Sequence, residues 1–300
     1  MSDILSLDPN EISQRDRHGY LLAAVAPRPI AFASTVDEQG RVNLSPFSFF
    51  NVFGSNPPIV IFSPARRGRD NTSKHTLDNL KQVPETVVNI VNYPMVEQMS
   101  LASTEYAEGV NEFVKAGFQQ VPSEVVKPPR VGEAPVAFEC TIDQIIETGT
   151  EGGAGNLVIA RVVRMHIQKK YLDEAGKLDT RKLDLVGRMG GIWYTRASGS
   201  ALFEIPKPSR DLGMGVDKLP ESVRLSPWLT GNELGRLGNL QHPPTEEKIR
   251  EAKLHPGVQA VLSLKNPASE AGREMLHLLA SSLLKAGETE MAQAILWLDA

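Results

Sequence analysis

The segment spanning residues 63–76 carries residue types that could bind a phosphate group. Guanidinium, ammonium and hydroxyl groups suit a phosphate, and so do the N–H groups at the start of a helix, which we expect near Ser73. Lys74 and Thr76 are the leading candidates because they fall at this helix start. A helix start that only faces solvent is the alternative interpretation. The full set of candidates is Ser63, Arg66, Arg67, Arg69, Lys74 and Thr76.

The segment Asn43–Phe50 could form a platform for a planar ring beside this anion site. It alternates small polar residues with aromatic ones, and we expect Pro46 to interrupt regular strand pairing. Such a segment can offer free backbone N–H groups to a ring that is rich in hydrogen-bond acceptors. A ring beside a phosphate indicates a nucleotide-like cofactor. Packing of Phe47, Phe49 and Phe50 inside a barrel is the alternative for at least one of these rings.

The elements that must position these residues are short strands. The sequence predicts a strand over residues 28–36, a hairpin turn at Asp37–Gly40 and a second strand that runs into residues 43–50. The glycine-rich residues 148–155 lie between two strands, which favours a plain hairpin over a nucleotide-binding loop. Many short strands without regular strand–helix–strand alternation indicate an antiparallel barrel. Further strands are expected at residues 58–63, 85–92, 135–147 and 156–168.

The chain resembles the flavin reductase-like family of FMN-binding split β-barrels from about Gly19 to about Pro208. The resemblance is nearest to the branch that includes reductase components of two-component monooxygenases. It implies a mainly β fold with some helix, with residues 1–208 as the split barrel, and a two-fold homodimer with flavin sites near the interface. The stretches that carry it are RPIAFASTVDEQGRVNLSPFSFFNVFGSNPPIVIFS, KHTLDNLK, TVVNIVN, NEFVKAGF and FEC.

The resemblance also implies which residues hold FMN. Ser34 and Thr35 are expected to reach the ring or the ribityl chain of the flavin, and Lys74 with Thr76 to hold its phosphate. The residues that match the family segment cradling the isoalloxazine ring, partly through the backbone, are Asn43, Leu44, Ser45, Phe47 and Ser48.

Further candidates lie outside these segments. Arg28 stands between two prolines in an extended backbone and could reach a cofactor, although a surface arginine at a sheet edge is the alternative. Arg188, Trp193 and Tyr194 could close the site from one side, or could serve packing at a barrel end. His166 lies on a strand where related reductases place a histidine near nicotinamide. A partly buried histidine without that role is the alternative.

The reaction that the resemblance implies is hydride transfer from NADH or NADPH to the flavin N5 atom. This step requires no protein acid or base, which explains why no catalytic constellation stands out in the sequence. The reduced flavin would then pass to a partner, such as a monooxygenase component, or to oxygen. A flavoenzyme that acts on its own small organic substrate is one alternative. A flavin-binding protein without turnover is the other.

Composition bounds the remaining possibilities. The 300 residues carry a net charge of −4, which is too small to indicate binding to nucleic acid or to an anionic membrane. No apolar run approaches the ~20 residues that span a bilayer, and the acidic N-terminus resembles neither a signal peptide nor a transit peptide. The single cysteine, Cys140, is compatible with a reducing cytoplasm. The six histidines lack metal-ligand spacing, so we expect no metal.

Residues 209–300 lie outside the resemblance and are expected to form a mostly helical extension. Helix starts are expected at Thr245 and Thr289, whereas LTGNELGRLGNL is interpreted as a flexible approach to the barrel. Docking of the extension on the barrel dimer is the preferred hypothesis, and a separately folded partner-binding module is the alternative. An apolar stripe at helical spacing is formed by Met275, Leu276, Leu279 and Leu283.

Overall fold

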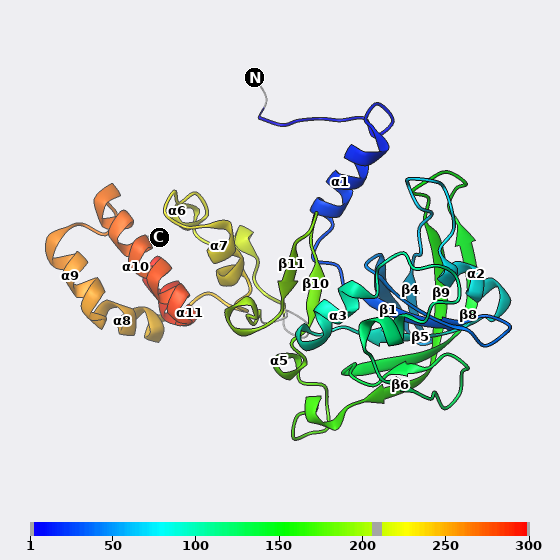
Figure 1. Cartoon of the computed structure of the whole chain (residues 1–300). Coiled ribbons are helices and arrows are strands. Elements are labelled where there is room, and N and C mark those ends of the chain that lie inside the picture. Colours follow the sequence, from blue (N-terminus) through cyan, green and yellow to red (C-terminus); the bar gives the residue numbers. More distant parts are fainter. Residues whose placement is uncertain (1–2, 206–211, 299–300) are drawn as a thin grey trace. The chain divides into compact units, whose positions relative to one another are not determined.

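The computed structural model describes residues 3–205 and 212–298 of the chain. The chain forms two compact units, Met1–Phe203 and Glu204–Ala300 (Figure 1). The first unit is mainly β with short helices, and the second is helical. This division into a β-rich region and a helical region is the fold class that the sequence predicts.

The first unit is organised around one antiparallel sheet of seven strands in the order β2-β1-β5-β8-β9-β4-β3. Strands β2 and β3 lie at opposite ends of this order, yet only residues 48 and 49 separate them in the chain. Because so short a link spans at most about 10 Å, the sheet must curl until its two edges approach each other. The result is a split β-barrel (Figure 1). The strands are β1 Ala31–Val36, β2 Val42–Phe47, β3 Phe50–Ser55, β4 Pro58–Phe62, β5 Glu85–Ile90, β8 Val136–Glu147 and β9 Asn156–Ile167.

Short helices and two small sheets complete the first unit. Helix α4 ends at Gly117, whose φ of 73° provides the left-handed cap that favours glycine. The helices are α1 Gln14–Ala24, α2 His75–Gln82, α3 Val96–Leu101, α4 Glu112–Ala116 and α5 Thr180–Leu183. The small sheets pair β6 Gln120–Val121 with β7 Arg130–Val131, and β10 Val186–Arg188 with β11 Tyr194–Arg196.

Strand β1 is buried on both of its faces. Successive side chains of a strand point to opposite faces, and all six residues of β1 are buried. Ala31 and Ala33 pack in the barrel interior with Phe62 of β4. Phe32 points the other way and packs in a second core that includes Phe113 of α4. Strand β1 therefore separates the barrel interior from the core beneath the short helices.

Pro46 does not interrupt strand pairing, so this expectation is wrong. Pro46 lies inside β2, opposite Phe32 in a regular register. Strand β2 is an edge strand, and the N–H of Leu44 donates to the carboxylate of Glu112, away from β1. Position 46 has the same orientation as position 44, so the missing N–H of proline would also face outward. The ladder therefore loses no hydrogen bond.

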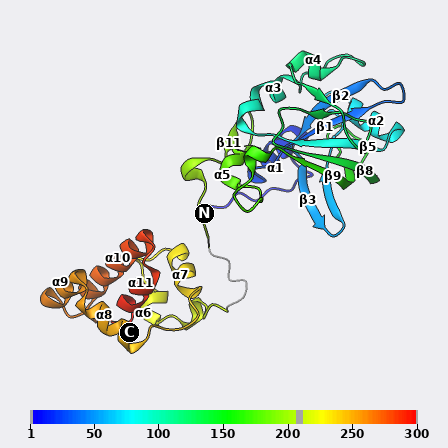
Figure 2. The same ribbon diagram turned by 90° about the horizontal axis from the view of Figure 1, so that it is seen from below.

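The second unit is a helical region (Figure 2). It has a hydrophobic core of its own. The fully buried members of this core come from residues 219–296. On α10, Leu276 and Leu283 of the predicted stripe are buried in it, whereas Met275 is partly exposed. A core of this kind supports the alternative of a separately folded module, and docking on the barrel stays a prediction. The helices are α6 Glu221–Arg224, α7 Gly231–Gly238, α8 Glu246–Leu254, α9 Pro256–Leu264, α10 Glu270–Ala286 and α11 Thr289–Leu296.

The stretch expected to be a flexible approach is instead helix α7. The side chain of Thr230 accepts the N–H of Glu233, and the carboxylate of Glu233 accepts the N–H of Thr230, so the two residues form a capping box. The helix start at Thr245 is confirmed, since its side chain caps α8. Thr289 is the first residue of α11 and not its cap. None of the helices in residues 3–205 and 212–298 is long and apolar enough to cross a membrane.

Candidate functional site

The candidate site is a small hollow where the loop after β4 enters helix α2, beside the edge strand β2. The hollow brings the predicted phosphate pair, Lys74 and Thr76, together with Asn43 and Ser45 from the predicted ring platform. Two regions far apart in the chain therefore meet at one place. The lining residues are Asn43, Ser45, Arg67, Glu112 and the segments 74–76 and 102–106.

The first turn of α2 supplies backbone donors to this hollow. Lys74 is the N-cap residue, with an extended backbone, and no side chain within the described residues caps the helix. The first N–H groups of a helix have no acceptor within the helix, and its dipole favours an anion at this end. The start of α2 therefore has the donors that an anion requires.

Thr76 adds an oriented hydroxyl group. It is buried, and its Oγ1 accepts a hydrogen bond from Nδ2 of Asn43 at 2.9 Å. Because the oxygen acts as acceptor here, the hydroxyl proton of Thr76 can be donated elsewhere. Thr35 lies behind this pair, and its Oγ1 accepts from Nδ2 of Asn79 at 3.1 Å. This network joins β1, β2 and α2.

Three cations gather around the hollow. Glu105 contacts Arg67 Nε at 3.1 Å, Arg69 Nη2 at 2.6 Å and Lys74 Nζ at 3.7 Å. Burial lowers the pKa of Lys74, the charge of Arg67 lowers it further, and Glu105 offsets part of the shift. Arg67 is fixed by bonds to Thr72 Oγ1 at 2.9 Å and to the carbonyl of Ser73. A partly desolvated ammonium beside a guanidinium, a hydroxyl and helix N–H groups fits a phosphate.

Glu112 is a residue of the site that sequence reasoning missed. Its side chain is buried at the start of α4, and its Oε2 accepts the N–H of Leu44 at 2.9 Å. Burial raises the pKa of this carboxyl, and the hydrogen bond from Leu44 opposes the shift. The outward N–H of Leu44 is therefore already paired with a side chain. The stretch NEFVKAGF contains Glu112, but nothing in its local pattern indicates contact with β2.

Three other predicted contacts have their hydroxyls bonded within the barrel. Ser34 is buried and its Oγ donates to the carbonyl of Pro129 at 2.6 Å. Ser63 is buried and its Oγ accepts the N–H of Asn156 at 2.9 Å. Thr35 accepts from the amide of Asn79, as described above. These groups hold strands and loops around the hollow, and neither Ser34 nor Ser63 is among the lining residues.

Among the aromatic residues of the platform, Phe47 is buried in the barrel and Phe49 is exposed. The ring of Phe47 is buried, with its centroid 5.6 Å from that of Phe62, so the barrel-packing interpretation holds for this ring. Leu44 is fully buried, whereas Ser48 is partly exposed beside Phe49. Phe49 is exposed and makes an edge contact with His18 of α1.

Arg28 links helix α1 to strand β10. Its guanidinium is buried and donates to the carbonyls of Leu22 and Val25, both at 2.5 Å, and of Met189 at 3.0 Å. The backbones of Arg28 and Arg188 form a bridge with both hydrogen bonds. Burial and the charge of Arg188 lower the pKa of Arg28. The described side-chain hydrogen bonds of Arg28 therefore join the C-terminal end of α1 to the residue that follows β10, and contact of Arg28 with a cofactor stays a prediction.

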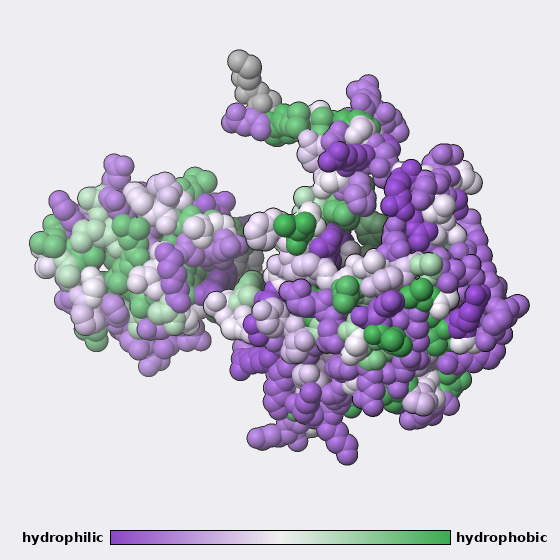
Figure 3. Space-filling view, viewed as in Figure 1, coloured by the Kyte–Doolittle hydropathy of each residue, from purple (hydrophilic) through white to green (hydrophobic). Residues whose placement is uncertain are grey.

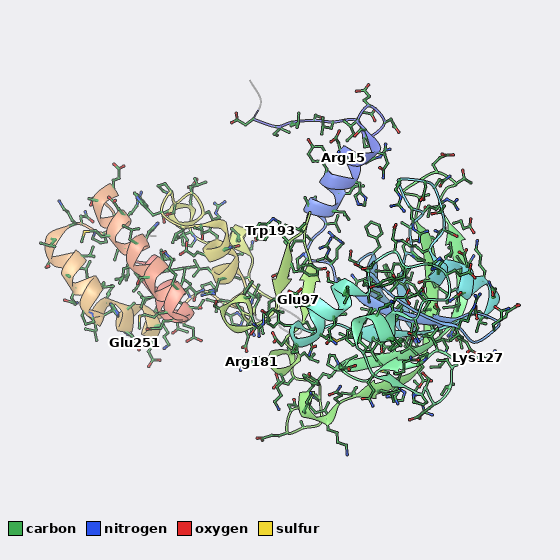
Figure 4. The ribbon with its side chains drawn as sticks, in the orientation of Figure 1. Arg15, Glu97, Lys127, Arg181, Trp193 and Glu251 are labelled. Carbon is green, nitrogen blue, oxygen red and sulfur yellow. The ribbon has the colours of Figure 1, made fainter. Side chains whose placement is uncertain are left out.

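The aromatic pair near the barrel end sits on the β10–β11 hairpin. Arg188 stacks on the ring of Tyr194, with 4.7 Å from the guanidinium carbon to the ring centroid. Trp193 is exposed in the turn of this hairpin (Figure 4). The turn lies against α1, because a Cβ added to Gly190 would meet Ala23 at 3.1 Å. The prediction that Arg188, Trp193 and Tyr194 close a flavin site stays a prediction.

His166 lies in a different hollow from Lys74 and Thr76, and the described linings of the two share no residue. Its Nε2 lies 2.6 Å from Oε1 of Glu139. Burial raises the pKa of Glu139, but hydrogen bonds from the N–H groups of residues 124–126 and from His166 bring it below its ordinary value. The pair fastens the loop around residue 125 to strands β8 and β9. Contact with nicotinamide stays a prediction.

The glycine-rich loop of residues 148–155 joins β8 to β9, as a plain hairpin does, and it also supports the cationic loop. The N–H of Arg66 donates to the carbonyl of Ala154 at 2.9 Å, and the N–H of Gly153 donates to the carbonyl of Arg66 at 3.0 Å. A Cβ at Gly152 would meet the carbonyl of Arg67 at 3.1 Å. Glycine suits this position because the two loops approach so closely that a side chain would have to push their backbones slightly apart.

No group of three or more His, Cys, Asp and Glu side chains within residues 3–205 and 212–298 could hold a metal ion.

Comparisons with known proteins give matches to the first unit of the chain. A family model described as the flavin reductase like domain matches residues 23–184. An uncharacterized protein from Halalkalibacterium halodurans is 34% identical over 207 residues, which are 68% of this chain and 97% of that protein. The structure of nitrilotriacetate monooxygenase component B from Bacillus cereus matches with a TM-score of 0.63 and 29% identity, over 68% of this chain and 100% of that one. The structure of a 2-nitrobenzoate 2-nitroreductase from Pseudomonas fluorescens matches with a TM-score of 0.58 and 26% identity, over 67% of this chain and 96% of that one.

The buried carboxyl of Glu112 leads to a prediction about stability and pH. Its pKa is raised in the folded protein, so the stability associated with the neutral form is present below the unfolded value of about 4.3 and is lost as the pH rises through the folded pKa. Glu112→Gln keeps an acceptor for Leu44 without a buried charge, so at pH 7 it should be at least as stable as the wild type. Glu112→Ala leaves that N–H without its acceptor and should cost about 1–3 kcal/mol.

Urea unfolding at neutral and acidic pH measures both variants. The advantage of Glu112→Gln should disappear in acid, where the wild-type carboxyl is also neutral. Equal losses for Gln and Ala at neutral pH would contradict the assignment.

Proposed function

This chain belongs to the flavin reductase-like family, and from that premise we propose that it is an FMN-dependent oxidoreductase of the NAD(P)H:flavin reductase type. The observation that carries the proposal is the cationic hollow at the start of α2, beside the edge strand β2. A single compact anion site next to a strand suits a flavin that carries one phosphate. FMN is therefore the proposed cofactor, and NADH or NADPH the proposed hydride donor.

The residues proposed to hold the phosphate are Lys74, Thr76 and the first N–H groups of α2. Lys74 supplies a charge that is partly withdrawn from water, where its attraction to a phosphate is less screened. Thr76 donates a hydroxyl whose oxygen is already oriented by Asn43. Arg67 adds a guanidinium fixed by its own bonds.

The residues proposed to face the ring come from β2 and its continuation, namely Asn43, Ser45 and Ser48. When bound, a flavin accepts a hydride from a reduced nicotinamide and passes the electrons to an acceptor. The task of the chain is then to orient the two ligands and to limit the access of water. Asn43 contributes to both parts of the site, because it belongs to the platform and also positions the hydroxyl of Thr76.

The electron acceptor is proposed from the comparisons. The likeness to nitrilotriacetate monooxygenase component B supports a role as the reductase of a two-component system, which delivers reduced flavin to a separate monooxygenase component. The likeness to a nitroreductase supports the second candidate, a flavoenzyme that reduces its own organic substrate.

The proposed location is the cytoplasm. Cys140 is a buried thiol whose pKa burial raises to about 12, and such an inert thiol fits this location.

A two-fold dimer is part of the proposal. The β3–β4 hairpin projects from the sheet (Figure 2) and exposes Val52 and Phe53. Within the described residues, α1 buries none of its side chains, and the arm before it exposes Leu5 among other hydrophobic groups (Figure 3). Arg28 and the β10–β11 turn contact the C-terminal end of α1, but a helix of eleven residues with no side chain buried in the part of the chain that the structure describes is marginal in water. A second copy of the chain would provide the surface that these groups lack.

The test of the reaction is a stopped-flow experiment. Protein with bound FMN should lose its flavin absorbance on mixing with NADH or NADPH and should recover it with oxygen. Faster recovery with a nitroaromatic acceptor than with oxygen would favour the second candidate function. Absence of bleaching with both nicotinamides, in protein that binds FMN, would contradict a reductase and leave flavin binding without turnover.

Phosphate recognition is tested by Lys74→Ala, with Lys81→Ala as the matched control on the same helix. Lys81 pairs with Glu147 at 2.6 Å, outside the hollow. A hydrogen bond to a charged group contributes roughly 1.5–3 kcal/mol, so Lys74→Ala should weaken FMN by about tenfold to more than a hundredfold. Riboflavin, which lacks the phosphate, should bind unchanged, as should both flavins to Lys81→Ala. Equal losses of FMN and riboflavin would reject phosphate contact.

Assembly is tested by sedimentation equilibrium. The wild type should give about twice the chain mass of 32.8 kDa. Phe53→Asp places a charge on the projecting hairpin and should shift the protein toward monomer. Val114→Asp is the control, because Val114 is equally exposed but lies on α4. A wild-type monomer that binds FMN would show that the site needs no second subunit.

A further inference from the structure

One acidic side chain stands among the cations that are proposed to bind phosphate. Oε1 of Glu105 lies 3.1 Å from Nε of Arg67 and 3.7 Å from Nζ of Lys74, and its Oε2 lies 2.6 Å from Nη2 of Arg69. A single carboxylate thus contacts all three positive groups. Glu105 belongs to the segment after α3, and it lines the same hollow as Lys74 and Thr76.

A phosphate and this carboxylate seek the same donors. Both are anions, so they compete for the same positive charges, and like charges a few ångströms apart repel each other. The other carboxyl group in the lining, Glu112, accepts the N–H of Leu44 and makes no described ion pair with these cations. Asp70 contacts only the outermost cation, Arg69, at 3.2 Å. Glu105 is therefore the anion placed to oppose a phosphate at Lys74.

The attachment of Glu105 is weak enough to be replaced. Its side chain is partly exposed, as is that of Arg69, and exposed ion pairs contribute little to stability. A second ion pair also attaches the segment after α3, because Glu108 pairs with Arg41 at 2.8 Å on an exposed surface. Movement of Glu105 away from Lys74 would break no described buried interaction of that side chain.

We propose that Glu105 competes with the FMN phosphate for Lys74 and Arg67, and that this competition makes the bound flavin exchangeable. The inference rests on the proposed function, since it assumes that FMN binds with its phosphate in this hollow. Glu105 acts as a built-in counterion whose displacement accompanies FMN binding. A flavin held against such a competitor leaves more readily, which suits a protein that hands reduced flavin to a separate acceptor.

A positioning role for Glu105 would change FMN affinity in the opposite direction. If Glu105 only holds Arg67 and Lys74 in position for the phosphate, its loss should weaken FMN binding. If it competes, its loss should strengthen FMN binding and leave riboflavin unaffected. The sign of the change therefore separates a competitor from a positioning residue.

The experiment is a fluorescence titration of the full chain with FMN and with riboflavin, for the wild type, Glu105→Gln and Glu108→Gln. Glu105→Gln is nearly isosteric and removes only the charge, so we expect it to bind FMN about three- to fivefold more tightly than the wild type at low salt. The gain should shrink at high salt because of screening. Riboflavin should bind all three proteins equally. Glu108→Gln is the matched control in the same segment and should change FMN affinity by less than about twofold.

Release of flavin gives a second readout. FMN should stay with Glu105→Gln through gel filtration for longer than with the wild type. Weaker FMN binding by Glu105→Gln, or an equal change for FMN and riboflavin, would overturn the inference while leaving FMN binding by the wild type intact. Unchanged FMN affinity would overturn it as well. A wild type that binds neither flavin would overturn the proposed function and this inference together. Thermal melting of each variant checks that equal riboflavin binding reflects an intact fold.

Discussion

The hydrogen bond from Asn43 to Thr76 is the contact on which the candidate site depends. It joins an edge strand of the barrel to the first turn of α2, two elements more than thirty residues apart in the chain. Its atoms are buried, so water competes little for them and the geometry is well defined. The same bond turns the Thr76 hydroxyl into an oriented donor beside Lys74. Without it, β2 and the first turn of α2 would lose the direct hydrogen bond that sets their relative position.

Two carboxylates line the hollow beside this contact and differ in environment. Glu112 is buried, its pKa is raised, and it serves the backbone of the edge strand at Leu44. Glu105 is partly exposed, and hydrogen bonds from Arg69 hold its pKa below the ordinary value. One group therefore maintains the shape of the hollow, whereas the other carries a charge into it. Glu105 lies in the segment between α3 and α4, Glu112 is the first residue of α4, and both line the hollow together with residues of β2.

Many polar side chains of the first unit join its elements to one another, at the candidate site and away from it. Arg28 fastens the end of α1 to β10, and His166 with Glu139 fastens a loop to the long β8–β9 hairpin. The glycine-rich loop supports the cationic loop through Arg66. The helical unit is different, because its buried core comes from its own helices and its capping box orders a stretch rich in glycine. Family membership applies to the first unit alone, since the family model matches residues 23–184.

The sequence by itself determined the barrel class, most strands and the helix start at which Lys74 and Thr76 lie, because hydrophobic patterns, turn residues and helix starts are local signals, whereas phosphate binding by this pair stays a prediction. It could not decide the orientation of Pro46, since that depends on whether β2 is an edge or a central strand. Nor could it find Glu112 and Glu105, whose partners lie dozens of residues away and meet them only after the sheet curls. Arg28 shows the same limit, because an arginine between two prolines has no local signal for the carbonyls that it binds. Tertiary structure decided these contacts because burial and partner geometry are properties of the folded chain.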